Sequence, residues 1–200
     1  MEEEGPELWV LSWDELYWDI FDLGCKIRES YRPSMIVAVA RGGWVVGRII
    51  SDLLSVDKVA SIGVKFYEEV GKRGRKPEIV QPLSVSVEGE DVLVVDDVAD
   101  TGETLALVRD SIESMGPSGV RVAVVYKKPW CRVRVDYYVR ETNKWVVFPY
   151  EQRETIEYLL VKMERKNLER REVVEALAAM GFDRELVERL VAEMESVRKV

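Results

Sequence analysis

A stretch near the middle of the chain, in which strand-forming residues run directly into acids and a glycine turn, constrains the fold most. Val92–Val95 are four consecutive β-forming residues bounded by polar ones, which predicts a fully buried strand. The run from Leu105 to Met115 predicts a helix that ends at Gly116. The residues between the two elements therefore lie at the carboxyl end of a strand, where open α/β sheets bind ligands.

The turn in this stretch has the chemistry of a phosphate-binding site. Gly102 lets the backbone approach a ligand closely, and Thr101 and Thr104 add hydroxyl donors to the amides that open the helix. Three carboxylates precede or begin the turn: Asp96, Asp97 and Asp100. Such carboxylates accept hydrogen bonds from ribose hydroxyls or hold a magnesium ion. The alternative, an acidic turn that only caps a helix, leaves a second Asp at a strand end unexplained.

The order of hydrophobic strand, Asp-Asp, three residues and Thr-Gly-x-Thr resembles the phosphoribosyl-diphosphate (PRPP) fingerprint of type I phosphoribosyltransferases. This resemblance implies an α/β fold with a mostly parallel sheet flanked by helices and a small hood. It implies Mg²⁺ as cofactor, a homodimer, and Asp100 as a catalytic residue. The residues implied to bind the 5′-phosphate and ribose are Asp96, Asp97, Asp100, Thr101, Gly102, Glu103 and Thr104.

A second strand end carries a small-basic-glycine turn. Met35–Val39 predicts a strand, and a helix is predicted from Trp44 to about Leu54. Between them lies the sequence Ala40-Arg41-Gly42-Gly43. Paired glycines expose amides to an anion, and Arg41 supplies a permanent forked cation. The resemblance implies that Ala40, Arg41 and Gly42 bind pyrophosphate and that Arg41 is catalytic, whereas taken alone the segment is only a turn.

A basic connection joins the next two predicted strands, Val59–Tyr67 and Glu78–Val87. The connection, Gly71–Pro77, contains four cations and two glycines. By itself it indicates a solvated hairpin tip. In the family the equivalent region is a lid that closes over PRPP and excludes water from a cation-like reacting centre. Lys65 and Arg73 are the pyrophosphate contacts expected here.

The segment after the fingerprint helix resembles the base-binding end of purine phosphoribosyltransferases. Strands are predicted at Val120–Tyr126, Asp136–Val139 and Lys144–Val147. The resemblance implies that Lys128 reaches the exocyclic group of the base, that Trp145 stacks on its ring, and that Glu151 binds metal with Asp96 and Asp97. The main chain of Val146 is expected to contact the edge of the base. The alternatives are a core tryptophan, an acid that only opens a helix, and a lysine that faces solvent.

Both ends of the chain are predicted to be helical. Ser12 and Glu15 form a capping box for a helix to about Tyr31. After residue 153 the composition becomes that of charged amphipathic helices, with Asp183 as an N-cap. The predicted helices are residues 154–166, 170–180 and 184–198. We therefore expect a phosphoribosyltransferase core at residues 1–152 and a helical bundle at residues 153–200, whose Ala179–Phe182 turn also resembles ubiquitin-associated modules.

Composition limits the partners and the acid–base chemistry. The net charge of −8 and pI near 4.9 argue against nucleic-acid binding, which needs a basic face. No 18-residue apolar run predicts a membrane span, and the acidic start and isolated cysteines indicate a cytoplasmic protein. The chain has no His, so carboxylates or lysines must transfer protons. The high charged content, 33%, resembles thermophile usage.

The predicted activity is transfer of the 5-phosphoribosyl group of PRPP to a purine base, with release of pyrophosphate. Lys128 is a donor suited to a 6-oxo group, which favours hypoxanthine, guanine or xanthine. The C-terminal helices resemble an extension of some crenarchaeal purine phosphoribosyltransferases, including adenine-specific ones, and main-chain carbonyls around Trp145 and Val146 could accept from the amino group of adenine. Adenine, giving AMP, is the sequence-based preference. A hypothesis of another class is a PRPP-sensing regulator on the same fold.

Overall fold

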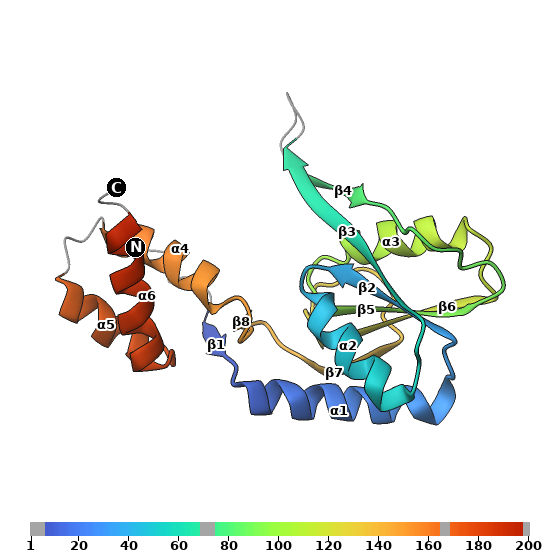
Figure 1. Ribbon diagram of the computed structural model, residues 1–200, viewed down its shortest axis with the longest axis horizontal. Helices are drawn as coiled ribbons and strands as arrows, with labels where there is room; N and C mark the ends of the chain where they lie inside the picture. Colours follow the sequence, from blue (N-terminus) through green and yellow to red (C-terminus); the bar gives the residue numbers. More distant parts are fainter. Residues whose placement is uncertain (1–6, 69–74, 165–168, 198–200) are drawn as a thin grey trace. The chain divides into compact units, whose positions relative to one another are not determined.

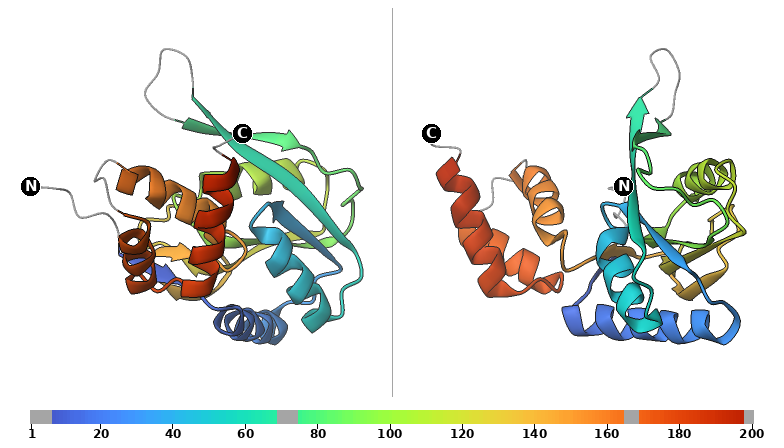
Figure 2. Two further views of the ribbon diagram at one scale, coloured as in Figure 1. Left: turned by 60° about the vertical axis from the view of Figure 1, so that its left-hand side comes forward. Right: turned by 45° about the vertical axis from the view of Figure 1, so that its right-hand side comes forward.

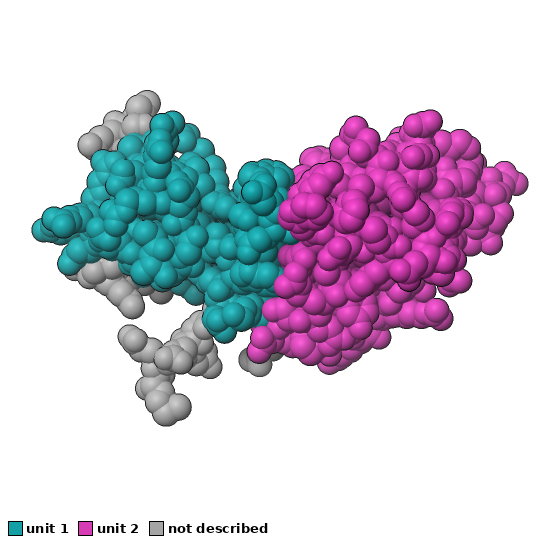
Figure 3. Space-filling view, turned by 90° about the horizontal axis from the view of Figure 1, so that it is seen from below, with its two compact units in different colours: residues 1–16, 144–200 teal, residues 17–143 magenta. Residues whose placement is uncertain are grey.

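The computed structural model describes residues 7–68, 75–164 and 169–197. The chain divides into two compact units (Figure 3). Unit 1 comprises Met1–Leu16 and Lys144–Val200, and unit 2 comprises Tyr17–Asn143. Unit 1 is thus built from both ends of the chain, whereas unit 2 is one continuous segment. The functional boundary expected between residues 152 and 153 stays a prediction.

Unit 2 contains a six-stranded sheet with the strand order β4-β3-β2-β5-β6-β7 (Figure 1). β3 and β4 pair antiparallel, and all other neighbouring strands of this sheet pair parallel. The strands are β2 Met35–Ala40, β3 Val59–Glu68, β4 Arg75–Gln81, β5 Asp91–Ala99, β6 Gly119–Lys127 and β7 Tyr137–Glu141. The expected mostly parallel sheet is confirmed, and the carboxyl ends of β2, β5 and β6 meet at one edge.

Helices cover both faces of this sheet (Figures 1 and 2). α3 (Glu103–Glu113) packs into a core cluster with Val37 and alternate residues of β5 and β6. α2 (Gly43–Leu54) lies over the opposite set of side chains, because a Cβ on Gly47 would come within 2.9 Å of the Ala38 Cβ. This two-sided burial explains why the parallel strands are continuous hydrophobic runs.

α1 (Trp13–Ser30) begins at the predicted capping box. The Glu15 amide donates to the Ser12 hydroxyl oxygen at 3.1 Å, and the Ser12 amide donates to the Glu15 carboxylate at 2.9 Å. The one polar group on its buried face, Asp19, accepts hydrogen bonds from two sheet residues, Tyr126 and Arg140. These bonds compensate for burying a carboxylate and attach the helix to the sheet.

The strand predicted at Glu78–Val87 is wrong at both ends, since β4 begins at Arg75 and ends at Gln81. The next residue, Pro82, has no N–H to donate to a ladder, so the pairing stops there. Beyond it, Val87 is fully buried and packs into the core of unit 2 without belonging to a strand. The apolar alternation in this segment therefore reflects a covering loop.

Unit 1 combines a two-stranded parallel sheet with three helices. β1 (Leu8–Val10), which the sequence did not predict, pairs with β8 (Trp145–Val147). The helices are α4 Gln152–Glu164, α5 Arg170–Ala179 and α6 Arg184–Val197, in agreement with the three predicted helices. Val147 shares one hydrophobic cluster with residues of all three helices, so the sheet and the bundle form a common core.

The turn between α5 and α6 is a structural part of this core. Phe182 is buried in the cluster of unit 1, and Gly181 has a φ of 101° that favours glycine. The Asp183 carboxylate accepts a hydrogen bond from the Leu186 amide at 2.8 Å, which confirms the predicted N-cap. The phenylalanine is therefore used for packing, not presented to a partner. In the described part of the chain, no helix is both long and apolar enough to cross a membrane.

Candidate active site

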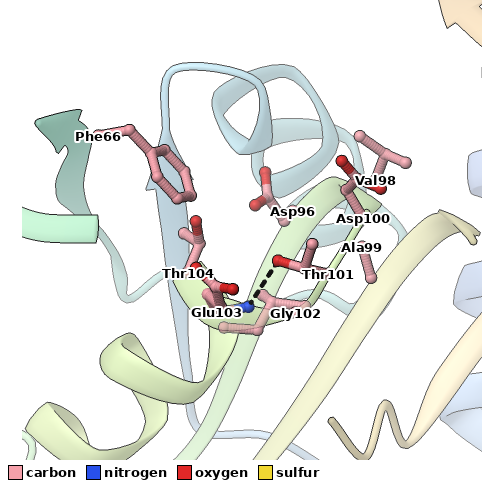
Figure 4. Close-up of a pocket in the computed structure, with 10 residues that line it drawn as sticks. Phe66, Asp96, Val98, Ala99, Asp100, Thr101, Gly102, Glu103 and Thr104 are labelled. Carbon is pink, nitrogen blue, oxygen red and sulfur yellow. Dashed lines mark hydrogen bonds between the residues drawn. The ribbon is translucent and has the colours of Figure 1, made fainter. Parts of the chain in front are cut away.

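The phosphate turn lies where β5 meets α3, at the carboxyl edge of the sheet. β5 continues through the acids to Ala99, and α3 begins at Glu103. Gly102, between them, has a φ of 90°, and the Thr101 hydroxyl oxygen accepts from the Glu103 amide at 3.4 Å. Figure 4 shows the turn residues and Asp96 around one hollow. This pocket of about 440 Å³ is lined by Phe66, Asp96 and Val98–Leu105.

Two neighbouring acids are buried beside this turn. Asp96 and Asp97 are each less than a tenth exposed. The Asp97 amide donates to the Asp96 carboxylate at 2.9 Å, and the Val98 amide donates to the Asp97 carboxylate at 2.7 Å. Burial, and next the charge of Asp97, raise the pKa of Asp96 well above its usual value. A ligand that brings hydroxyl donors or a cation to these carboxylates would relieve that unfavourable environment.

The glycine turn after β2 touches these same acids. A Cβ on Gly42 would lie 1.9 Å from an Asp97 carboxylate oxygen, and one on Gly43 would lie 2.5 Å from the Val95 carbonyl oxygen. Neither position can hold a larger residue without displacing the end of β5. The Ala40–Arg41 peptide bond is cis, and the Arg41 side chain is exposed. The structure thus brings the predicted pyrophosphate loop next to the predicted ribose-binding acids.

The segment after β6 is hydrogen-bonded to the backbone of the phosphate turn. The Lys128 amide donates to the Ala99 carbonyl at 2.9 Å, and the Arg132 amide donates to the Thr101 carbonyl at 3.1 Å. A Cβ on Gly102 would lie 2.3 Å from a Val133 methyl carbon, so only glycine fits between turn and support. Strand-end sequence patterns carry no signal for this support, because it depends on the neighbouring strand.

Lys128 is buried next to the catalytic candidate Asp100. Lys128 is the only lysine among the buried residues of the described chain, and it is 8% exposed. Burial lowers the pKa of Lys128, and the nearby Asp100 charge partly opposes that shift. The Lys128 amine lies 5.8 Å from the centre of the Trp130 ring, and the Trp130 indole N–H donates to an Asp100 carboxylate oxygen at 2.6 Å. Sequence reasoning missed Trp130, although it follows directly after Lys-Lys-Pro.

The region expected to form a lid is only partly described. Lys65 is exposed on β3, opposite Glu78 of β4, and Arg73 lies outside the described residues. Phe66, which the sequence analysis did not select, extends from β3 beside Thr104 and lines the pocket (Figure 4). The contacts predicted between Lys65, Arg73 and pyrophosphate stay predictions.

The remaining predicted residues belong to unit 1. Trp145 is 47% exposed, and its ring stacks on Tyr158 of α4 with an interplanar angle of 11° and centroids 6.3 Å apart. Val146 is buried on β8, and a Glu151 carboxylate oxygen accepts from the Phe148 amide at 3.3 Å. The roles of these residues in base and metal binding stay predictions, since the acids and Lys128 belong to unit 2.

Comparison with known proteins identifies the family. Residues 12–153 match the phosphoribosyl transferase domain family. A xanthine-guanine phosphoribosyltransferase of Gluconobacter oxydans is 30% identical over 145 residues, covering 71% of this chain and 83% of that protein. A similar protein of Desulfotalea psychrophila is 29% identical and covers 76% and 91%.

Solved structures of phosphoribosyltransferases are also similar to this chain. A purine phosphoribosyltransferase from Pyrococcus horikoshii is 39% identical, covers 72% of this chain and 93% of that one, and superposes with a TM-score of 0.66. The Helicobacter pylori xanthine-guanine-hypoxanthine enzyme, 20% identical with a TM-score of 0.63, shares the fold. The family match spans more than half of the chain and includes the phosphate turn, the acids and the glycine turn. The chain therefore belongs to the phosphoribosyltransferase family and is a pentosyltransferase.

Proposed function

We propose that this enzyme transfers the 5-phosphoribosyl group of PRPP to a 6-oxopurine, forming a nucleoside 5′-monophosphate and releasing pyrophosphate. The observation that carries the proposal is the buried Lys128 amine beside Asp100 at the carboxyl edge of the sheet. An ammonium group only donates hydrogen bonds, so it suits the oxygen at position 6 of hypoxanthine, guanine or xanthine. Adenine presents an amino donor there and leaves the lysine without an acceptor.

The relatives support the same choice over the sequence-based preference for adenine. The curated proteins from Gluconobacter and Desulfotalea are both named xanthine-guanine phosphoribosyltransferases. The preference for adenine rested on a resemblance of the C-terminal helices, which lie beyond the matched residues 12–153. We therefore place 6-oxopurines ahead of adenine.

In this proposal the two turns bind different parts of the PRPP molecule. The helix-opening amides and hydroxyls of Thr101–Thr104 bind the 5′-phosphate, and Asp96 and Asp97 accept hydrogen bonds from the ribose hydroxyls. Arg41 and the amides of its turn hold the pyrophosphate as its bond to the sugar breaks. Asp100 accepts the proton of the purine imidazole as the new bond to the sugar forms.

The acids also fit a magnesium ion that is bound jointly with the substrate. Within the described residues no cluster of three or more potential metal-ligating side chains occurs. Asp96 and Asp97 nevertheless lie side by side, and the raised pKa of Asp96 indicates a site where a cation would be favourable. Mg²⁺ commonly uses one or two carboxylates together with substrate phosphate oxygens. When bound, the ion would neutralise charge on the leaving pyrophosphate.

The decisive experiment measures pyrophosphate release from PRPP and Mg²⁺ with each of the four bases adenine, hypoxanthine, guanine and xanthine. We expect kcat/KM to be highest for a 6-oxopurine, and Lys128→Met to lose that activity without gaining turnover of adenine. Highest activity with adenine would contradict the proposal. A PRPP-binding chain that turns over none of the four bases would support the regulator hypothesis instead.

A further inference from the structure

The side chain of Trp130 contacts Asp100 on the turn after β5. Asp100 is exposed on the phosphate turn, and an exposed aspartate side chain samples several rotamers. Here the Trp130 indole N–H donates to Asp100 Oδ1 at 2.6 Å. The indole nitrogen can only donate, so this bond fixes one oxygen of the carboxylate and leaves Oδ2 with its full capacity to accept.

The backbone around Trp130 is suited to hold such a contact in place. The Cys131 amide donates to the Lys128 carbonyl at 3.0 Å, which closes a turn around Pro129 and Trp130. The same segment is tied to the strand that carries Asp100 through the bond from the Lys128 amide to the Ala99 carbonyl. Tryptophan and carboxylate are therefore anchored to one rigid frame.

We propose that Trp130 is a positioning residue, whose indole N–H orients Asp100 so that Oδ2 accepts the proton of the incoming purine. The proposal rests on the proposed function, because it assigns Asp100 to the base. The Lys128 amine lies over the ring of the same tryptophan, 5.8 Å from its centre. Trp130 therefore sets the spacing between the group that receives the proton and the group that donates to the 6-oxo oxygen.

A purely structural role does not explain this contact. Trp130 is 50% exposed, so its ring fills little of the core. Removing the indole N–H while keeping an aromatic ring should leave the melting temperature unchanged. The expected consequence is kinetic, because a carboxylate that is misplaced in the reacting complex slows proton transfer more than it weakens binding.

The test is Trp130→Phe, which keeps an aromatic ring near Lys128 and removes the donor. We expect kcat to fall about ten- to hundredfold, the scale of a hydrogen bond to a charged group, with KM for PRPP unchanged. Trp18→Phe is the matched control, because Trp18 is also exposed, at 63% on α1, and its ring contacts Tyr17 and Phe21 of the same helix. An unchanged kcat in Trp130→Phe would overturn the proposal.

A double-mutant cycle separates positioning from other effects. If Trp130 acts through Asp100, adding Trp130→Phe to Asp100→Asn should not lower kcat further. Reductions that multiply would show that Trp130 acts independently of Asp100, and the proposal would be wrong. The kinetics use whichever of the four bases gives the highest kcat/KM, so an incorrect choice of base affects the proposed specificity and not this test. A chain without turnover on any base overturns both.

Discussion

The phosphate end, by which we mean the turn between β5 and α3 with the acids before it, differs from unit 1 in how its residues are brought together. The phosphate end is a local structure, because one strand, one turn and the first residues of α3 supply most of its groups, and glycines fit against the acids and their support. Unit 1 joins segments from both ends of the chain, with Leu8 paired to Trp145, and the rings of Trp145 and Tyr158 are about half exposed. In the proposed function, phosphate is therefore recognised mainly through backbone geometry, whereas the recognition of the base expected in unit 1 depends on side chains that packing holds in place.

The two regions also differ in how much ordering a bound ligand requires of the protein. Backbone amides at a helix start are already oriented, so binding phosphate there costs little ordering. The stacked pair of Trp145 and Tyr158 is about half exposed and depends on the core beneath it for its position. Changes in unit 1 should therefore act through stability and base affinity, whereas changes at the phosphate end should act on turnover.

The largest effect that we expect is the loss of turnover in Asp100→Asn, at the phosphate end. Asp100→Asn keeps a short polar residue on the turn, so PRPP binding should be retained. Turnover should fall by about 10² to 10⁴, the usual range for a positioned acid–base group. Steady-state kinetics and calorimetric titration of PRPP measure the two quantities separately. Turnover close to that of the unmodified enzyme would remove Asp100 from the mechanism.

The next prediction concerns the core of unit 1. Leu177 is fully buried in that cluster, and Leu177→Ala should lower the stability of unit 1 by about 2 to 5 kcal/mol. Hydrogen exchange should speed up in α5 and α6 and stay unchanged in β5, since β5 belongs to unit 2. Leu190→Ala, at a partly buried position of the same cluster, is the control with a smaller expected loss. Faster exchange in β5 would show that the two units unfold together.

Trp145→Ala probes the base end directly. Loss of a stacking ring should weaken base binding by about 1 to 3 kcal/mol and leave PRPP affinity nearly unchanged. Tyr158→Ala, which removes the ring stacked on Trp145, should have a smaller effect in the same direction. The measurement is the KM for base at saturating PRPP. Equal losses for base and PRPP would assign Trp145 to the core of the protein.

The smallest expected effect is a pH dependence. Burial lowers the pKa of Lys128, so its amine loses its proton at a lower pH than an ordinary lysine as the pH rises. The KM for a 6-oxopurine should therefore increase severalfold between about pH 7 and about pH 10. Lys128→Arg keeps the charge throughout this range and should make the increase smaller, because only ionisation of the base itself then remains. An increase of the same size in Lys128→Arg would show that Lys128 is not the titrating group.

The phosphate end was predictable from the sequence because its information is local. The hydrophobic run of β5, its acids and the turn at Gly102 follow one another in the chain and lead directly into α3. The sequence also predicted the capping box at Ser12 and the N-cap at Asp183, which depend on residues three positions apart. These features need no knowledge of the tertiary fold.

The features that were missed depend on distant contacts. β1 has three residues and exists only through its pairing with β8. Trp130 follows β6, a neighbour of β5, and Phe66 lies on β3, which β2 separates from β5, so both reach the turn after β5 only once the sheet has formed. The end of β4 was placed wrongly because apolar spacing outweighed Pro82, whose missing donor is the stronger physical signal.

The split composition of unit 1 has a consequence for synthesis on the ribosome. Its first strand, β1, leaves the exit tunnel before unit 2, but β8 and the three helices that complete its core are translated after unit 2. Unit 2 is continuous and can fold while translation continues, as domains commonly do. The strand β1 therefore has no β8 to pair with until residues 145–147 have been translated. A stalled or truncated polypeptide that ends before residue 145 would keep the phosphate site and lack the partner of its first strand.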